Sequence, residues 1–401
     1  MKRRIFACML ACVFLTGGCG QPAGTPEESP AETAPEEALS LESGTEDPDA
    51  GNGDLAVQEE EPDLHEYDFT LAFAGDINLG DDWGTIDYYR EQENGIRGCI
   101  DPQLIERMQT ADLMCLNLEC CLSDAGAPME GKAYTFRGSP DYVGILKELG
   151  VDLVNLANNH VFDYGEEAFL DMLSVLEEAG LPKVGAGADA QEAQAPWYGT
   201  FDGKTVAVVS ATRAEKYILT PEAGENTPGV FRCYEMENLL STVEEADRNA
   251  DFVIAYIHWG TEYSEKLEEA QTEGARALAE AGADVVLGAH PHCLQGAEYF
   301  NGTPVFYSLG NYWFNEKTLD TTLLELHFYG NDEEQYLEVT PVPARQEGYY
   351  TRLLTDPQEA DAWQTHMEEM EPSGIWFDKN GIAREVEYRW KSDRQIEERE
   401  N

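Results

Sequence analysis

The sequence predicts a layered α/β domain with buried strands. Short runs rich in Val, Ile and Leu alternate with helical segments, which is typical of strands covered on both faces. Hydrophobic residues make up 42% of the chain and aromatic residues 10%, enough to bury a sizeable core. Two of the expected helices, 166–179 and 267–281, are each followed by a glycine, Gly180 and Gly282, which is a common helix end.

The expected elements follow one another between residues 69 and 370. Strands are expected at 69–74, 113–118, 151–156, 206–210, 252–257, 285–287 and 305–308. Helices are expected between them, at 102–110, 140–149, 166–179, 235–249 and 267–281. Residues 322–328 and 336–342 have no helix between them, which predicts an antiparallel pair. A last helix is expected at 357–370, followed by a charged tail over 373–401.

The N-terminus has the features of an export signal, which we assign to residues 1–19. Three basic residues precede an apolar run over 5–15 that is too short to span a bilayer comfortably. Residues 15–19, Leu-Thr-Gly-Gly-Cys, resemble a bacterial lipobox, although Thr16 stands where an aliphatic residue is usual. We therefore expect lipidation of Cys19 and anchoring at the extracellular face of the cell membrane. An ordinary signal peptide cut nearby is the alternative.

Charge divides the rest of the chain. Residues 20–66 hold 15 acidic residues and neither Lys nor Arg, which predicts an extended, disordered linker. The net charge of the whole chain is −52, of which about −40 falls in residues 67–401. This balance excludes a nucleic-acid binder, because phosphate contacts need clustered Lys and Arg. We expect one main domain over 67–345 and a helical, charged extension over 346–401.

Side chains able to bind metal recur where the expected strands end. They follow five separate strands: Asp76, Asn78, Glu119, Asn159, His160, His258, His290 and His292. Singly, each has an ordinary explanation as a cap or turn residue. Turns have no reason to select histidine at three strand ends, however, and the carboxyl ends of strands in an open α/β sheet meet at one edge. Mixed imidazole, carboxylate and amide ligands suit Mn, Fe or Zn better than Mg or Ca.

Six motifs carry a family resemblance over about residues 68–345. They are Gly75-Asp76-Ile77-Asn78, Asn117-Leu118-Glu119, Asn158-Asn159-His160, His258-Trp259-Gly260, Gly288-Ala289-His290-Pro291-His292 and Ser308-Leu309-Gly310-Asn311. Together they resemble the capsule-synthesis CapA/PgsA family, which is associated with poly-γ-glutamate and is similar to the calcineurin-like metallophosphoesterases. The resemblance implies an α/β/β/α metallophosphoesterase-like sandwich with a central mixed β-structure.

The resemblance also implies two divalent metal ions. Asp76 and His292 would bind the first, and Glu119 would bridge the two. The implied ligands of the second are Asn159, His258 and His290.

His160 is implied as the donor of a proton to the leaving group. Two positions depart from the superfamily pattern. Asn78 stands where a histidine ligand is usual, which weakens the first metal site, and Val161 stands where an acid usually follows the Asn-His pair. Asp163 is our candidate for orienting His160 in its place.

Three further residues are predicted to contact a substrate. Arg137, in a loop that resembles the family, and Arg213, just past a strand, could meet an anionic substrate, although a surface salt bridge explains each of them slightly better. Asn311 follows the strand at 305–308 and is expected beside the site.

Three functions remain open at this point. The first is a membrane-anchored metal-dependent hydrolase acting on a phosphoester or on a γ-glutamyl amide. The second is a non-catalytic component of a capsule synthase complex that binds polymer or synthase subunits, and the third is a binding lipoprotein with a structural metal.

Overall fold

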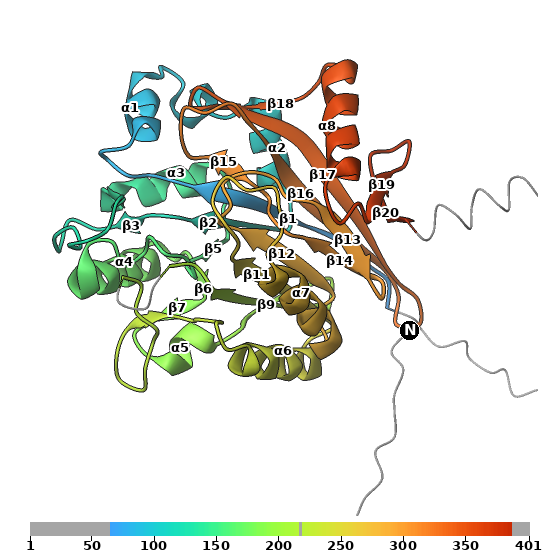
Figure 1. Ribbon diagram of the computed structural model, residues 1–401, viewed down its shortest axis with the longest axis horizontal. Coiled ribbons are helices and arrows are strands. Elements are labelled where there is room, and N and C mark those ends of the chain that lie inside the picture. The colour runs from blue at the N-terminus through green and yellow to red at the C-terminus, as the bar shows by residue number, and fades with distance from the viewer. Residues whose placement is uncertain (1–64, 216–218, 387–401) are drawn as a thin grey trace, which may run out of the picture. The chain divides into compact units, whose positions relative to one another are not determined.

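The computed structural model describes residues 65–215 and 219–386. The predicted signal peptide, Cys19 and the linker up to residue 64 lie outside these residues. Two β-sheets pack face to face, and helices cover the outer face of each, so the α/β/β/α class predicted from the sequence is confirmed (Figure 1). Within the described residues, no helix combines the length and the apolar character that crossing a membrane requires.

The larger sheet has ten strands and mixes parallel and antiparallel pairs. Eight of them run in the order β19 (Ile375–Phe377), β20 (Ala383–Glu385), β17 (Gln335–Glu347), β16 (Leu319–Gly330), β1 (Tyr67–Ile77), β2 (Leu113–Leu118), β5 (Leu153–Asn155) and β6 (Lys183–Val184). In addition, β15 (Asn311–Trp313) pairs with the end of β1, and β18 (Tyr350–Leu353) pairs with β17. The expected antiparallel pair is β16 and β17.

The smaller sheet has six strands. Their order is β13 (Ala297–Phe300), β14 (Thr303–Phe306), β12 (Val285–Ala289), β11 (Phe252–His258), β9 (Lys204–Thr212) and β8 (Trp197–Phe201). Two short pairs lie outside both sheets, formed by β3 (Cys121–Leu122) with β4 (Arg137–Gly138) and by β7 (Ala186–Gly187) with β10 (Gly229–Val230). Because β9, β11, β12 and β14 pair in parallel, their carboxyl ends point to one edge.

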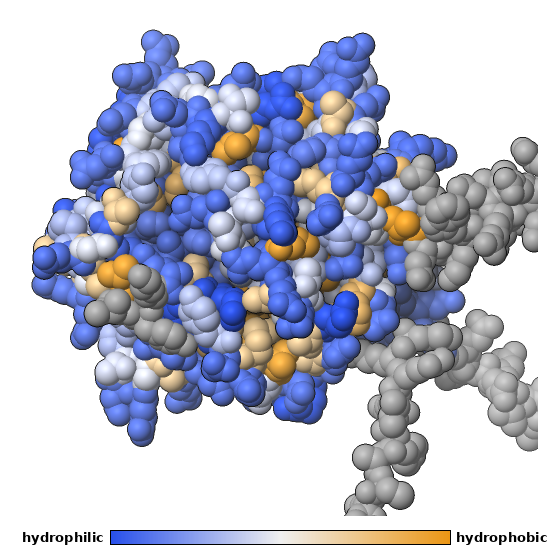
Figure 2. Space-filling model, in the orientation of Figure 1, coloured by the Kyte–Doolittle hydropathy of each residue, from blue (hydrophilic) through white to orange (hydrophobic). Residues whose placement is uncertain are grey.

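The side-chain alternation of the strands divides the core into three layers. In β1, Phe69 and Phe73 point into the core between the sheets, whereas Ala72 and Ala74 pack under the helices of the larger sheet. That outer layer contains α1 (Gly84–Glu91), α2 (Pro102–Thr110), α3 (Val143–Glu148) and α4 (Gly165–Ala179). Helices α6 (Glu237–Asn249) and α7 (Glu269–Ala281) cover the smaller sheet, and α5 (Ala190–Gln194) lies beside β7. The face visible in Figure 2 is mostly hydrophilic, with its apolar residues in small separate groups.

The chain beyond residue 345 is part of the same sheet. Strands β18, β19 and β20 extend it, and α8 (Pro357–Glu369) packs against β17 and β19. Trp363 and Met367 of α8 are buried in the core between the sheets, as are Ile375 and Ala383. The sequence predicted a charged tail from residue 373, whereas residues 375–377 and 383–385 form strands because these apolar side chains complete the core.

Candidate metal centre

The predicted ligands converge where the carboxyl ends of strands from both sheets meet. The larger sheet contributes Asp76 from β1, Glu119 directly after β2 and Asn159 in the segment after β5. The smaller sheet contributes the last residue of β11 and two residues that follow β12, His258, His290 and His292. The candidate ligand atoms form two overlapping groups, and within each group they lie within 4.8 Å of one another. One group is Glu119, His290 and His292; the other is Asp76, Glu119 and His258.

Glu119 lies at the centre of this cluster. It is fully buried, and its Oε1 has no hydrogen-bond partner among the described residues. The Nε2 atoms of His160, His258 and His292 surround this oxygen at 3.8, 3.9 and 3.7 Å, too far for hydrogen bonds. A buried carboxylate oxygen ringed by imidazoles without bonding to them has the arrangement that a cation completes, since buried polar atoms are otherwise almost always paired.

The electrostatics of the cluster agree with a cation site. Burial, and then the charge of Asp76, raise the pKa of Glu119 well above its usual value. Burial, and then the neighbouring His290 and His292, hold the pKa of His258 well below its usual value. Burial and His292 lower the pKa of His290 to about 3. The two imidazoles are therefore neutral near pH 7 and have lone pairs for a metal, while two buried carboxylates need a positive charge beside them. The cluster thus indicates a divalent-cation site.

The segment that carries two of the histidines has a strained backbone. His290 has φ = 96° and His292 has φ = 57°, both in the left-handed region that non-glycine residues rarely adopt. Such residues cost of order 1–3 kcal/mol each and concentrate at functional sites. The ring centroids of these two imidazoles are 6.0 Å apart.

Asn117 holds the two carboxylates together. Its Nδ2 donates to Asp76 Oδ1 at 2.8 Å and to Glu119 Oε2 at 3.2 Å. Its Oδ1 accepts from the side-chain amides of Asn155 and Asn158 at 3.2 and 3.1 Å. We did not select Asn117 from the sequence, although alternation along β2 places it on the same face as Glu119, two residues on.

His160 stands beside the cluster with its orientation held by Asp163. His160 Nδ1 donates to Asp163 Oδ2 at 2.7 Å, and the same oxygen accepts the backbone N–H of Phe136 at 2.6 Å. The structure therefore places Asp163 where the sequence had assigned an orienting acid. It also brings in Lys132, a residue that we did not select, whose ammonium group bonds to the other oxygen of Asp163.

The remaining predicted residues lie in different surroundings. Asn78 is buried, and its Oδ1 accepts the N–H of Gly80 at 2.7 Å while its Nδ2 has no partner among the described residues. Asn311 is also buried, and its Oδ1 accepts a hydrogen bond from His292 Nδ1 at 2.9 Å, so it orients a candidate ligand.

The two arginines are not brought to the cluster. The Arg137 guanidinium donates to the carbonyl of Ala125 at 3.0 Å and lies 4.2 Å from the ring centroid of Tyr164. The Arg213 guanidinium donates to the carbonyl of Tyr234 at 3.0 Å and lies over its ring. Neither arginine lines the cavity that opens onto the cluster, because each guanidinium is held by a nearby backbone carbonyl and an aromatic ring.

A cavity of about 480 Å³ opens onto His160 and His292. Its walls are mainly aromatic, formed by Trp83, Tyr134, Phe136, Tyr263, Phe314 and Tyr349. Four charged residues also line it: Asp82, Glu262, Glu316 and Lys317. The Lys317 ammonium already lies 3.3 Å from the ring centroid of Tyr263. The cavity can therefore hold a group with an apolar or planar body next to the cluster.

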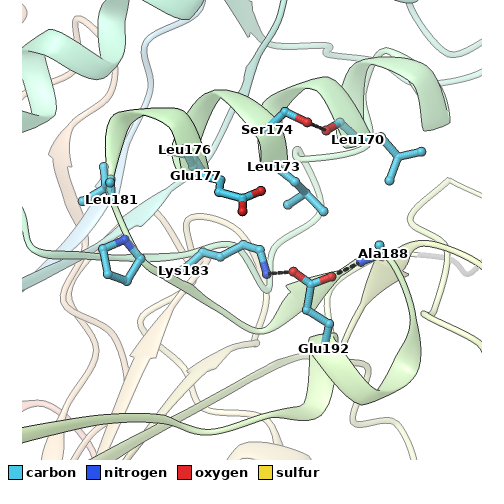
Figure 3. Close-up of a pocket in the computed structure, with 11 residues that line it drawn as sticks. Leu170, Leu173, Ser174, Leu176, Glu177, Leu181, Lys183, Ala188 and Glu192 are labelled. Atoms are coloured by element: carbon cyan, nitrogen blue, oxygen red, sulfur yellow. Dashed lines mark hydrogen bonds and ion pairs between the residues drawn. The ribbon is translucent and has the colours of Figure 1, made fainter.

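A larger cavity, of about 580 Å³, lies away from the cluster beside α4 (Figure 3). Four of its lining residues are leucines, and its one lysine, Lys183, is paired with Glu192 at 2.7 Å. Because it contains none of the clustered residues, we do not assign the chemistry to it.

The fold and the site define a two-sheet α/β sandwich with a buried carboxylate–histidine cluster, a candidate metal centre, at its strand ends. Residues 70–316 match the family described as bacterial capsule synthesis protein PGA_cap, and the chain belongs to that family. The resemblance noted in the sequence is thus confirmed.

Relatives of known name agree with this membership. The chain is 36% identical over 204 residues to the PGA biosynthesis protein CapA of Bacillus subtilis, covering 50% of this chain and 53% of the relative. It is 34% identical over 207 residues to the capsule biosynthesis protein CapA of Bacillus anthracis, covering 50% and 49%. A probable polyglutamine synthesis accessory protein of Mycobacterium tuberculosis is 29% identical over 209 residues, covering 50% and 55%. The chain spans about half the length of these curated relatives.

Solved structures resemble the chain more distantly. A putative 5'-nucleotidase from Staphylococcus aureus, in complex with alpha-ketoglutarate, has a TM-score of 0.42 at 16% identity, covering 75% of this chain and 58% of that one. A hypothetical protein from Thermus thermophilus has a TM-score of 0.39 at 17% identity, covering 68% and 99%.

Proposed function

We propose that this protein is a metal-dependent hydrolase that acts in the synthesis or processing of poly-γ-glutamate capsule. The observation that carries the proposal is the unpartnered Oε1 of Glu119, ringed by three imidazole nitrogens beside a cavity. Membership of the capsule-synthesis family supports the biological setting.

Two divalent ions, Mn, Fe or Zn, fit the donor set best, because it mixes neutral imidazole, carboxylate and amide groups. When bound, they would supply Lewis-acid activation of water and of the scissile bond. The residues that would hold them are Asp76, Glu119, Asn159, His258, His290 and His292.

His160 supplies the proton in the proposed reaction. In hydrolysis the attacking water loses a proton as its oxygen bonds to the phosphorus or carbonyl carbon, the bond to the leaving group breaks, and the leaving atom takes up a proton from His160, which then regains one from solvent. With Nδ1 donating to Asp163, His160 can give up a proton from Nε2 only as the imidazolium, which is protonated on both ring nitrogens, and His160 lines the cavity. The aromatic walls limit the access of other water to the reacting group.

The charge of the cavity bears on the substrate. Three carboxylates and one lysine line it, and the lysine is stacked on Tyr263. Such a surface does not attract an extended polyanion, so we propose that a short segment or a chain end reaches the cluster, with either a phosphoester or a γ-glutamyl amide as the scissile group. The names of the Bacillus relatives favour the amide.

Membrane attachment and partners belong to the same proposal. We propose that a lipid on Cys19 anchors the protein at the extracellular face of the cell membrane, where it works with poly-γ-glutamate synthase subunits. The N-terminal sequence supports the anchor, and the accessory role in the name of the mycobacterial relative supports the partners. Metabolic labelling with an alkyne fatty acid tests the anchor, because Cys19→Ser would abolish the label.

A second candidate function is a non-catalytic component that binds polymer or synthase subunits. The observation that favours it is Asn78, whose amide oxygen is already bonded to the backbone of Gly80 and so adds little to a first metal site.

Metal analysis and hydrolysis assays separate the two candidates. The purified protein would be assayed on an aryl phosphate and on poly-γ-glutamate, beside His160→Ala. Turnover that is lost in this variant while metal is retained supports the hydrolase. Bound metal with polymer binding but without turnover supports the second candidate, and a folded protein that takes up no metal contradicts the hydrolase.

A further inference from the structure

Lys132 is a buried cation beside the candidate metal centre to which the proposed reaction assigns no part. It lies on the loop between β3 and β4, and its side chain is 1% exposed. Its ammonium group donates to Asp163 Oδ1 and to the backbone carbonyl of Asn159, and it pairs with Glu215 Oε2 at 2.9 Å. The ammonium group thus makes two hydrogen bonds and one further ion pair.

The partners of Lys132 lead directly to the residues of the proposed chemistry. Both oxygens of Asp163 are engaged, Oδ1 by Lys132 and Oδ2 by His160 Nδ1 and by the Phe136 N–H, so this carboxylate cannot rotate freely. The carbonyl of Asn159 is held by Lys132, while its side-chain oxygen lies 2.8 Å from His258 Nε2. One ammonium group thus ties down an amide ligand and the orienting acid of His160.

We propose that Lys132 is a positioning residue of the proposed hydrolytic site. By holding the Asp163 carboxylate in place, it keeps the Nδ1–H of His160 directed at Asp163 and the Nε2 facing the cluster, 3.8 Å from Glu119 Oε1. The catalytic consequence rests on the proposed function, whereas the effect on the orientation of His160 does not. The competing role is charge compensation alone, in which Lys132 stabilises buried Asp163 without affecting proton transfer.

The test compares full-chain Lys132→Met and Lys132→Arg with the wild type. Lys183→Met is the matched control, because Lys183 is also largely buried and paired but lies in the other cavity (Figure 3). Metal content is measured first. Turnover is then measured on phenyl phosphate and on p-nitrophenyl phosphate, since phenolate needs protonation to leave and nitrophenolate needs little. The imidazole N–H of His160 is followed by ¹⁵N NMR and assigned by its absence in His160→Ala.

We expect Lys132→Met to keep its metal and to lose about 10- to 100-fold of turnover on phenyl phosphate, as is typical when an orienting partner is removed. Turnover on p-nitrophenyl phosphate should fall much less, and the His160 N–H signal should broaden or disappear. Lys132→Arg keeps the charge but not the geometry, so it should show a smaller loss of the same kind. Lys183→Met should change neither readout.

An unchanged His160 N–H signal in Lys132→Met would overturn the proposal. An equal loss of turnover on both esters would also overturn it. If Lys132→Met does not fold, Lys132→Arg decides by the same two readouts. If the wild type hydrolyses neither ester, the proposed function fails on these substrates, but the N–H signal still decides whether Lys132 positions His160.

Discussion

The carboxylates of Glu119 and Asp76 are fully buried. Among the described residues, imidazole and amide groups lie next to them. Burial, and then repulsion by the charge of Asp76, raises the pKa of Glu119 well above its usual value. At the residue scale, therefore, the cluster is costly without a cation, and the energetics of metal binding can be tested separately from catalysis.

Glu119→Gln should leave the melting temperature of the metal-free protein unchanged or raise it, because one of the two repelling charges is removed. The same variant should lose most of the stabilisation by metal, which for the wild type is about 2.7 kcal/mol at a metal concentration 100 times Kd. Thermal denaturation with a chelator and then with added Zn²⁺ or Mn²⁺ measures both effects. Exposed Glu177 on α4 provides the control, Glu177→Gln, and an undiminished gain with metal in Glu119→Gln would contradict the prediction.

Buried neutral histidines should make the metal-free protein sensitive to acid. The pKa of His290 is about 3 in the folded protein and about 6.5 when unfolded, so the unfolded state binds more protons between these values. Stability is therefore lost as pH falls from about 6.5 toward 3, by about 1.4 kcal/mol per pH unit for this one group. The raised pKa of Glu119 acts in the opposite direction, but His258 adds to the histidine effect.

Urea denaturation in chelator at pH 7 and pH 5 measures this dependence. His290→Gln cannot be protonated, so its stability should fall less between the two pH values than that of the wild type. Equal slopes for the two proteins would show that His290 is not the responsible group.

At the scale of elements, the two histidines after β12 depend on a close backbone approach. A Cβ on Gly288 would lie 1.8 Å from the carbonyl oxygen of Tyr307. Two residues later in the same segment, the N–H of Leu309 donates to the carbonyl oxygen of Gly288 at 3.0 Å. Only glycine lets these two segments lie so near one another.

Gly288→Ala should therefore destabilise the protein by about 3 kcal/mol or more, because relieving the clash requires a backbone shift in a packed strand. It should also lower metal affinity, since His290 follows two residues later. Chemical denaturation and metal titration measure the two effects. In the control, Gly144→Ala within α3, the added Cβ meets nothing within 4 Å, and we expect a gain of up to about 1 kcal/mol. Equal stability of the two variants would contradict the prediction.

At the scale of the whole molecule, the site exists because two sheets are held face to face. Asp76 and Glu119 come from one sheet and His258, His290 and His292 from the other, so the core between the sheets sets the distances in the cluster. The described C-terminal elements close one side of this core with Trp363, Met367 and Ile375.

A chain that ends at residue 355 should therefore be poorly soluble or have a greatly lowered melting temperature. Burial of each large apolar side chain contributes about 1.5–3 kcal/mol, so losing three approaches the entire stability of a typical domain. Soluble yield and thermal denaturation measure the effect. A chain that ends at residue 386 is the matched control, because it retains α8, β19 and β20. Equal melting temperatures for the two chains would show that α8, β19 and β20 do not stabilise the sheets.

Much of this protein is determined by the sequence itself. The alternation of apolar runs predicted the main strands and helices because burial on both faces of a strand leaves a local pattern. The candidate metal ligands could be found because each lies at or just after the end of a strand, and parallel strands bring their ends to one edge. The family followed from six short motifs, all within 75–311.

Only the tertiary structure shows which contacts form between segments that are distant in the sequence. Lys132 lies in a loop without periodicity, and its partners Asp163 and Glu215 are distant in sequence, so its burial follows only from how three segments meet. Asn117, Asn311 and Arg137 likewise act through hydrogen bonds that no local sequence pattern specifies. Strands β19 and β20 have only three residues each, too few to show a pattern, and they form because Ile375 and Ala383 complete the core between the sheets.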